Sequence, residues 1–248
     1  MKTVKILRTI IMIAAAVFAA ATAGAQTARE YFALGNNAYK TGDYARALEN
    51  YSLAEKNGFD SAELYFNKAN AFAKLDRRGD ALLNYKRAVY NAPRMREATA
   101  NLAMYAKDNS LESGLEAFKT PLIAELSESE WATVCFVSFW AAVLLVFVPP
   151  LYGKRPPATL FLAIVFAAAF AAAIPSILDW RNFADTAVAL KPDTKLAVSP
   201  TKTAPAAAIV DAGQCAKILK SRGGYLYLET KNGKRGWAAA ADFAPTVE

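Results

Sequence analysis

The chain of 248 residues contains no histidine and only two cysteines. Histidine is the commonest general base and the commonest metal ligand, so its absence removes the usual routes to proton transfer and metal binding. Cys135 lies within an apolar stretch and Cys215 in the C-terminal part, so we expect two unpaired packing residues rather than a disulfide or a catalytic thiol. No spacing of carboxylates marks a catalytic pair. The sequence therefore predicts no catalytic residue, no metal site, no cofactor and no enzyme activity.

The chain also lacks a basic surface of the kind that binds nucleic acid. The net charge is +7, yet residues 26–130 hold 14 basic and 15 acidic groups. Much of the positive excess lies in residues 1–25 and in the pair Lys154-Arg155. Basic residues are not clustered along one stretch, so we expect no nucleic-acid partner.

Residues 1–25 have the pattern of a secretory signal peptide. Three basic residues precede an apolar stretch, and Ala23-Gly24-Ala25 fits a small-x-small cleavage site. We expect cleavage after Ala25, and an uncleaved anchor is the alternative. In both cases the segment that follows is exported.

Two long stretches without charged residues predict membrane-spanning helices at residues 131–152 and 158–178. A helix needs about 20 mostly apolar residues to cross the hydrocarbon core. The second stretch is rich in alanine, which favours close packing of the two helices as a hairpin. Neither stretch contains the ionisable residue that an ion pathway usually needs, so transport is not expected.

The turn between these stretches, residues 153–157, indicates the topology. It carries Lys154 and Arg155, and positive charge in a short loop marks the cytoplasmic side. Trp131 and Trp180 lie where interfacial aromatic residues are expected. Together with the signal peptide, these features predict a protein of the bacterial inner membrane with both of its soluble parts in the periplasm.

The region between the signal peptide and the first span is repetitive. Equivalent positions hold residues of the same kind, either aromatic or small. The pairs are Tyr31 and Tyr65, Gly35 and Ala69, Ala47 and Ala81, Tyr51 and Tyr85, and Ala54 and Ala88. A period of about 34 residues is typical of stacked helix–turn–helix units, and the pattern resembles the tetratricopeptide repeat family. The resemblance implies an all-α solenoid over residues 26–127, with clear repeats at 28–61 and 62–95 and degenerate capping helices after them.

The repeat pattern also suggests which residues pack and which bind. Small residues permit close approach of the helices, and these are Gly35, Ala47, Ala54, Ala69, Ala81 and Ala88. Tyr51 and Tyr85 are expected to fill the layer between the helices. Lys68 departs from the family, which has leucine there, and Asp76 stands at the place of a turn glycine. Four asparagines fall on the expected inner face of the first helices: Asn36, Asn67, Asn70 and Asn101.

Asparagine is a poor residue for a helix interior. We therefore interpret the four as amides offered to the backbone of a bound peptide, and hydrogen bonding between neighbouring repeats is the alternative. Chaperone-binding members of the family grip a terminal carboxylate with cations. Phe32 and Glu97 stand at those positions here, so we expect no such clamp.

The C-terminal part is strand-like. Residues 214–219 are a short strand candidate, residues 225–230 and 234–239 read as two further strands, and Asn232-Gly233 between the last two is a two-residue hairpin signal. The ending x-G-x-x-G-W, with Gly233, Gly236 and Trp237, resembles that of bacterial SH3-like domains. The resemblance implies a small all-β barrel over residues 184–246, in which Trp237 either packs at the barrel edge or serves as a ligand platform.

The order of these parts resembles the BatE family of aerotolerance operons. The expected fold class is a multidomain membrane protein with a tetratricopeptide repeat solenoid, a two-helix transmembrane hairpin and a small SH3-like barrel. The resemblance implies a periplasmic scaffold or adaptor that works with von Willebrand factor A-type membrane proteins and a MoxR-type ATPase. The alternative function is peptidoglycan binding or envelope sensing through the SH3-like part.

Overall fold

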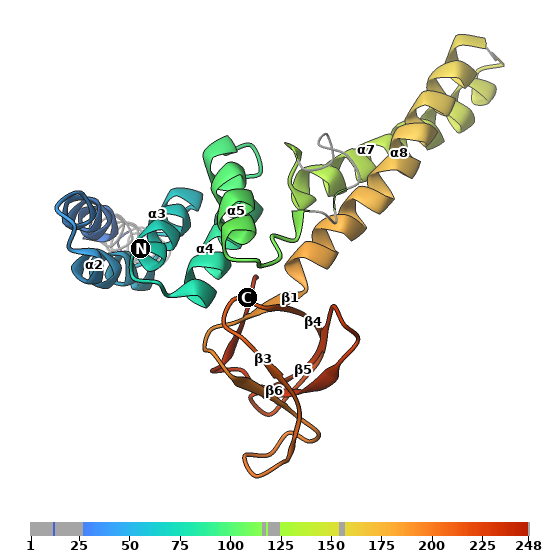
Figure 1. The fold of residues 1–248 in the computed structure, drawn as a ribbon. Helices are drawn as coiled ribbons and strands as arrows, with labels where there is room; N and C mark the ends of the chain where they lie inside the picture. The colour runs from blue at the N-terminus through green and yellow to red at the C-terminus, as the bar shows by residue number, and fades with distance from the viewer. Residues whose placement is uncertain (1–11, 13–26, 116–117, 119–124, 154–156, 248) are drawn as a thin grey trace, which may run out of the picture.

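The computed structural model of the chain describes residue 12 and residues 27–115, 118, 125–153 and 157–247. The predicted signal peptide, apart from Met12, and the pair Lys154-Arg155 lie outside the described residues. Within the described part, a row of short helices comes first, two long apolar helices follow, and an antiparallel sheet ends the chain (Figure 1). The fold is thus a mixture of helices and a sheet.

The first of the short helices is described from residue 27 to residue 40. The row continues with α2 (Tyr44–Lys56), α3 (Ala62–Lys74), α4 (Arg78–Asn91) and α5 (Arg96–Asp108). The number of residues from the start of α2 to the start of α4 equals the number from the start of α3 to the start of α5. This separation equals the one between the paired residues of the sequence repeat, so the helix starts follow its period.

Capping side chains and turn residues fix these helix boundaries. The Asp43 and Ser61 side chains each accept a hydrogen bond, at 3.1 Å, from a backbone N–H in the first turn of α2 and α3. Gly42 and Asp76 occupy equivalent turns and both have positive φ, +81° and +53°. Asp76 therefore adopts a left-handed conformation that the glycine of the first repeat adopts without steric cost.

Close packing between neighbouring helices depends on the small residues. Gly35, Ala47, Ala54, Ala69, Ala81 and Ala88 are all buried. Gly35 lies directly beneath the Tyr51 ring, since a Cβ added at Gly35 would be 2.5 Å from Cδ1 and from Cε1 of that ring. A larger residue at this position would separate the first helix from α2.

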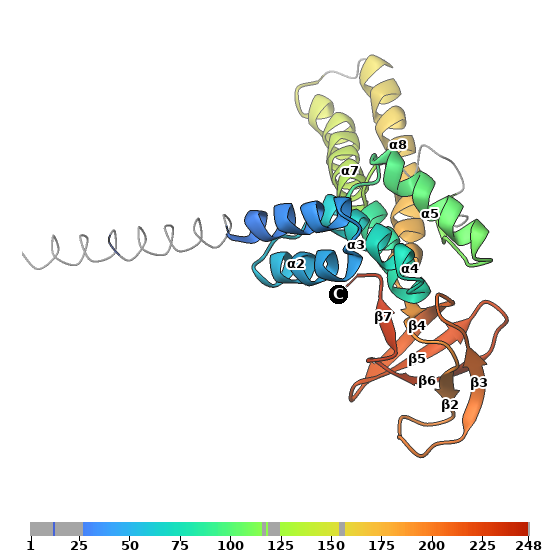
Figure 2. The ribbon, with the colours of Figure 1, turned by 60° about the vertical axis from the view of Figure 1, so that its left-hand side comes forward.

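The two apolar helices are α7 (Glu128–Leu151) and α8 (Pro157–Ala184), and they project together from the rest of the molecule (Figures 1 and 2). Only 6% of the apolar 18-residue stretch of α7, and 17% of the corresponding stretch of α8, is buried inside the protein. A core helix of a soluble protein would be mostly covered, so these two helices have both the length and the exposed apolar surface to span a membrane.

Helix α8 extends beyond the predicted span, which ends at residue 178. Its last turns enter a hydrophobic core shared with α4 and α5, where Trp180 and Phe183 are almost fully buried. The Trp180 ring packs against Tyr90 and Phe118, at centroid distances of 5.9 and 4.7 Å. Trp180 is therefore a core residue with no exposed surface for the membrane interface, contrary to the expectation that it is an interfacial aromatic.

The sheet has seven strands in the order β3-β2-β6-β5-β4-β1-β7, and all neighbouring strands are antiparallel. The strands are β1 (Thr186–Ala189), β2 (Thr194–Ala197), β3 (Ala206–Val210), β4 (Cys215–Arg222), β5 (Tyr225–Thr230), β6 (Arg235–Ala239) and β7 (Phe243–Pro245). Every strand contributes a residue to one apolar cluster, so the sheet curls around a common core. The edge strands β3 and β7 are not paired with each other, so the sheet is open.

Glycines form the two long hairpins of the sheet. The loop between β5 and β6 is longer than the expected two residues: Gly233 N–H donates to the Thr230 carbonyl at 2.9 Å, and Gly233 has a φ of +74°. This arrangement matches a three-residue loop with a bulge glycine. The tight turn is instead at Gly223-Gly224, both with positive φ, which joins β4 to β5.

Candidate functional site

The structure brings the four predicted asparagines together in two pairs. Asn67 on α3 donates through Nδ2 to Oδ1 of Asn36 on the first helix, at 2.9 Å. Asn101 on α5 approaches Oδ1 of Asn70 on α3 in the same way, at 3.5 Å. Each pair therefore bridges the first helices of neighbouring repeats, which is the alternative that the sequence left open.

A buried tyrosine completes each pair. The Tyr51 hydroxyl donates to Asn36 Oδ1 at 2.9 Å, and the Tyr85 hydroxyl donates to Asn70 Oδ1 at 2.6 Å. The two tyrosines are 0% and 4% exposed. We refer to Tyr51, Asn36 and Asn67 as the first triad, and to Tyr85, Asn70 and Asn101 as the second triad.

The triads fix the orientation of the amides. Oδ1 of Asn36 accepts two hydrogen bonds, so its Nδ2 is directed away from Tyr51 and Asn67. Asn67 uses Nδ2 as the donor, which leaves its Oδ1 as the group that can accept. The second triad repeats this arrangement with Asn70 and Asn101. Each half-buried pair thus keeps N–H donors on both amides and one carbonyl acceptor that no bond within the triad uses.

Burial keeps the two tyrosines in the donor form. It raises the pKa of Tyr51 to about 12, with a smaller contribution from nearby Tyr39. Burial likewise raises the pKa of Tyr85 to about 12, while a hydrogen bond with Asn101 acts in the opposite direction. Both hydroxyls therefore remain protonated at neutral pH.

Aromatic neighbours hold the tyrosine rings in place. Phe32 packs on Tyr51 at a centroid distance of 5.9 Å, and Tyr105 packs on Tyr85 at 5.5 Å. The sequence predicts only a filling role for both tyrosines, and the structure adds the hydrogen bond to the asparagine. The signal for this second role is the equal spacing of 15 residues from Asn36 to Tyr51 and from Asn70 to Tyr85.

Lys68, at the position where the repeat family has leucine, is 7% exposed. Its Nζ forms an ion pair with Glu55 Oε2 at 2.6 Å, which links α3 to α2. Helices α2 and α3 are therefore joined by a charged contact that is largely shielded from solvent on the lysine side.

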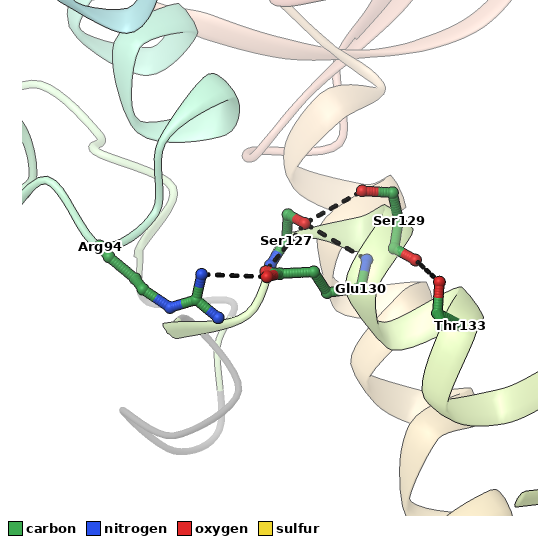
Figure 3. A network of polar contacts seen from close by, with 5 residues as sticks. All are labelled: Arg94, Ser127, Ser129, Glu130 and Thr133. Atoms are coloured by element: carbon green, nitrogen blue, oxygen red, sulfur yellow. Dashed lines mark hydrogen bonds and ion pairs between the residues drawn. The ribbon is translucent and has the colours of Figure 1, made fainter. Parts of the chain in front are cut away.

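A polar network at the start of α7 joins the apolar helices to α4 (Figure 3). The Ser127 side chain accepts from Glu130 N–H at 3.3 Å, and Ser127 N–H donates to Glu130 Oε2 at 2.9 Å, which makes a capping box. Arg94, just after α4, donates to Glu130 Oε1 at 3.0 Å. The pKa of Glu130 is lowered by the Ser127 N–H first and by Arg94 next.

The residues of the predicted SH3-like signature, Gly233, Gly236 and Trp237, lie on and beside β6. Gly236 is buried, and a Cβ there would be 2.8 Å from Leu196 Cβ, so strands β2 and β6 need this glycine. Trp237 is half-buried and lies outside the apolar core of the sheet. It packs on Tyr227 of β5 at a centroid distance of 5.0 Å. Gly233 is exposed in the hairpin loop.

Among the described residues, no group of three or more cysteines, aspartates and glutamates is placed to hold a metal ion. In comparisons with known proteins, no protein-family model matches the chain and no curated sequence matches it. Its function is therefore argued from the residues and their geometry.

Proposed function

We propose that the chain is a membrane-anchored scaffold that binds an extended segment of a partner protein along its first helices. In this proposal the helices at residues 27–108 are tetratricopeptide repeats, and the curled sheet is an SH3-like domain. Helices α7 and α8 anchor both parts in the inner membrane, with the two soluble parts in the periplasm. By resemblance to the BatE family, the partner is a von Willebrand factor A-type membrane protein of an aerotolerance system that includes a MoxR-type ATPase.

The observation that carries this proposal is the repeated triad. A polypeptide backbone presents N–H donors and carbonyl acceptors in alternation. Each triad presents amide N–H donors and a carbonyl acceptor, and the next triad presents the same set one repeat further along. The buried tyrosines fix the amides before a ligand arrives, which reduces the entropy lost on binding.

The regular spacing of helix starts, the buried small residues and the positive-φ turn residues support the repeat assignment. Helices α7 and α8 support the anchor because they are long, apolar and mostly uncovered. The order of strands and the close approach at Gly236 support the SH3-like assignment.

The test uses the double variant Asn67→Ala with Asn101→Ala, crosslinked in native membranes and analysed by mass spectrometry. These two asparagines are the amide donors of the triads, and their replacement leaves both partners of the Tyr51–Asn36 and Tyr85–Asn70 hydrogen bonds in place. The matched control is Asn57→Ala, an exposed asparagine at the end of α2 whose side chain donates to the Leu53 carbonyl.

We expect the wild type and the control to crosslink to the same partner and the double variant to lose it, while circular dichroism shows unchanged helix content. If the folded double variant keeps every partner, the asparagines do not form the binding surface and the proposal is wrong in its central point.

A second candidate function, peptidoglycan binding, is favoured by one observation. Tyr227 and Trp237 form a half-buried aromatic pair outside the core of the sheet. Aromatic faces of this kind suit sugar rings or peptide side chains. Sedimentation of the full chain with purified sacculi, compared with Trp237→Ala, tests this candidate. Equal recovery of both forms in the pellet would argue against it.

A further inference from the structure

A cavity of about 640 Å³ is lined, among the described residues, by α4, α5 and the loop between them and by Leu115, Phe118 and Glu125. Its wall is mostly apolar and includes Val89, Pro93, Ala100, Ala103, Leu115 and Phe118. The volume falls within the range of roughly 300–1,000 Å³ that small-molecule sites occupy. No triad residue is among its described lining residues, so it is separate from the proposed peptide surface.

The cavity lies next to the base of the two apolar helices. Arg94, which lines it, donates to Glu130 in the first turn of α7 at 3.0 Å. Glu125, also in its wall, shortly precedes α7. Phe118 packs on Trp180 near the end of α8 at 4.7 Å. If α7 and α8 span a bilayer, these contacts place the cavity at the level of the lipid headgroups.

The charged residues of the cavity are of both signs. Arg94 uses one nitrogen for Glu130 and keeps its other N–H donors. Arg96 is exposed and forms no ion pair within the described residues. Guanidinium groups recognise phosphate through paired hydrogen bonds. The Glu125 carboxylate is suited to a cation.

We propose that this cavity binds one phospholipid with an ethanolamine headgroup, taken from the adjoining leaflet. An acyl chain lies along Val89, Ala100 and Ala103. Arg94 and Arg96 hold the phosphate, and Glu125 holds the ammonium group. A purely anionic headgroup would give Glu125 no cation to bind, and a purely apolar ligand would make no use of Arg94 and Arg96. The inference rests on the membrane anchoring included in the proposed function.

The test is native mass spectrometry of the full chain, purified in detergent, stripped of lipid and then titrated separately with phosphatidylethanolamine, phosphatidylglycerol and phosphatidylcholine. Ala100→Trp and Ala103→Trp fill the cavity from exposed positions on α5, and Arg96→Ala removes one phosphate ligand. The matched controls on α2 are Ala45→Trp and Arg46→Ala, which replace exposed residues away from the cavity.

We expect the wild type and both controls to retain one phosphatidylethanolamine in preference to the other two lipids. The filled variants should lose the one-lipid mass shift, and Arg96→Ala should weaken it. Retention of the lipid by the folded filled variants, or equal retention of all three lipids by the wild type, overturns the inference.

Carbonate extraction of native membranes separates this outcome from a failure of the proposed function. A chain that resists extraction but binds no lipid contradicts the lipid site alone. A chain released by carbonate contradicts the membrane anchor on which the site depends. Partner crosslinking by Ala103→Trp reports on the triads independently, because that substitution leaves all six triad residues in place.

Discussion

Substitution of Gly79 by alanine tests how the sheet is attached to the repeat helices. Gly79 lies in the first turn of α4 and is buried. A Cβ at this position would be 2.2 Å from the Ala189 carbonyl oxygen and 2.7 Å from Leu190 Cα. Both neighbours are backbone atoms at the end of β1, so they cannot rotate away as a side chain can. The chain must therefore separate α4 from β1 to accept the methyl group.

Two opposing effects decide the result. Alanine is favoured over glycine within a helix by up to about 1 kcal/mol, so the substitution alone would stabilise α4. Overpacking of a tight contact costs typically about 1–3 kcal/mol. Because the contact at Gly79 is with backbone, we expect the cost to lie at the upper end and the net loss to be about 1–2 kcal/mol.

The assay is hydrogen exchange followed by mass spectrometry of the detergent-solubilised chain. Gly79→Ala should speed exchange in β1 and β7, whose backbone is held beside α4, and should leave α2 unchanged. The repeat provides its own control: Ala45 occupies the equivalent position in α2 and is exposed. Ala45→Gly therefore measures the propensity effect without the contact. A Gly79→Ala chain that is more stable than the wild type, with unchanged exchange in β1, would refute the docking geometry.

Two further predictions concern charged groups and pH. Unfolded tyrosines titrate near pH 10, whereas burial raises the pKa of Tyr51 and Tyr85 to about 12, so the stabilisation present below pH 10 should be lost as the pH rises from 10 to 12. Urea unfolding in detergent at pH 8 and 11 should show this loss, and Tyr51→Phe should reduce it; a midpoint independent of pH would contradict the burial argument. Glu55→Gln leaves the Lys68 ammonium buried without its counter-charge and should cost about 1–3 kcal/mol, whereas Lys68→Leu should be near neutral or stabilising. Equal losses in the two variants would show that the ion pair itself stabilises the helices.

The helix starts were predictable because their cause is local. The period of the repeat is visible without any knowledge of long-range contacts, and the caps at Asp43 and Ser61 act within one turn. The strand at residues 225–230 was predictable for the same reason. The strand predicted at 214–219 ends too early, because β4 continues to Arg222. The Gly223-Gly224 turn that follows β4 is also a local signal and could have placed this strand end correctly.

Contacts between distant segments were not predictable. Trp180 follows an apolar span, where an interfacial role is the natural interpretation, and only the packing of Tyr90 and Phe118 around it shows that it is a core residue. Gly79 has the same character. The repeat has alanine at the equivalent position, Ala45, and glycine at Gly79. The reason for this difference is the close contact of Gly79 with the end of β1, which lies far along the chain. The asparagine pairs were predictable in part. Their regular spacing is visible in the sequence, but the sequence left open whether the amides bind a peptide or each other across neighbouring repeats.

Helix α4 connects the three parts of the molecule. Its Gly79 contacts the end of β1, and Arg87 donates to the Pro245 carbonyl of β7 at 3.1 Å. The Lys86 side chain is fully buried, its Nζ lies 4.5 Å from the centroid of the Phe183 ring of α8, and it has no hydrogen-bond partner among the described residues. A desolvated ammonium is costly unless it is compensated, and a cation–π contact supplies on the order of 2 kcal/mol at such a site.

The contact between Lys86 and Phe183 therefore exists only while α8 stays docked on α4, so it links the positions of these two helices. Tyr85 of the second triad precedes Lys86 directly in α4, so the residue that orients the amides and the residue that holds α8 belong to one rigid turn. The surface that carries the triads consequently has a fixed orientation relative to the apolar helices. In the proposed function, a partner segment bound to this surface is held at a defined distance from the membrane without the entropy cost of a flexible linker.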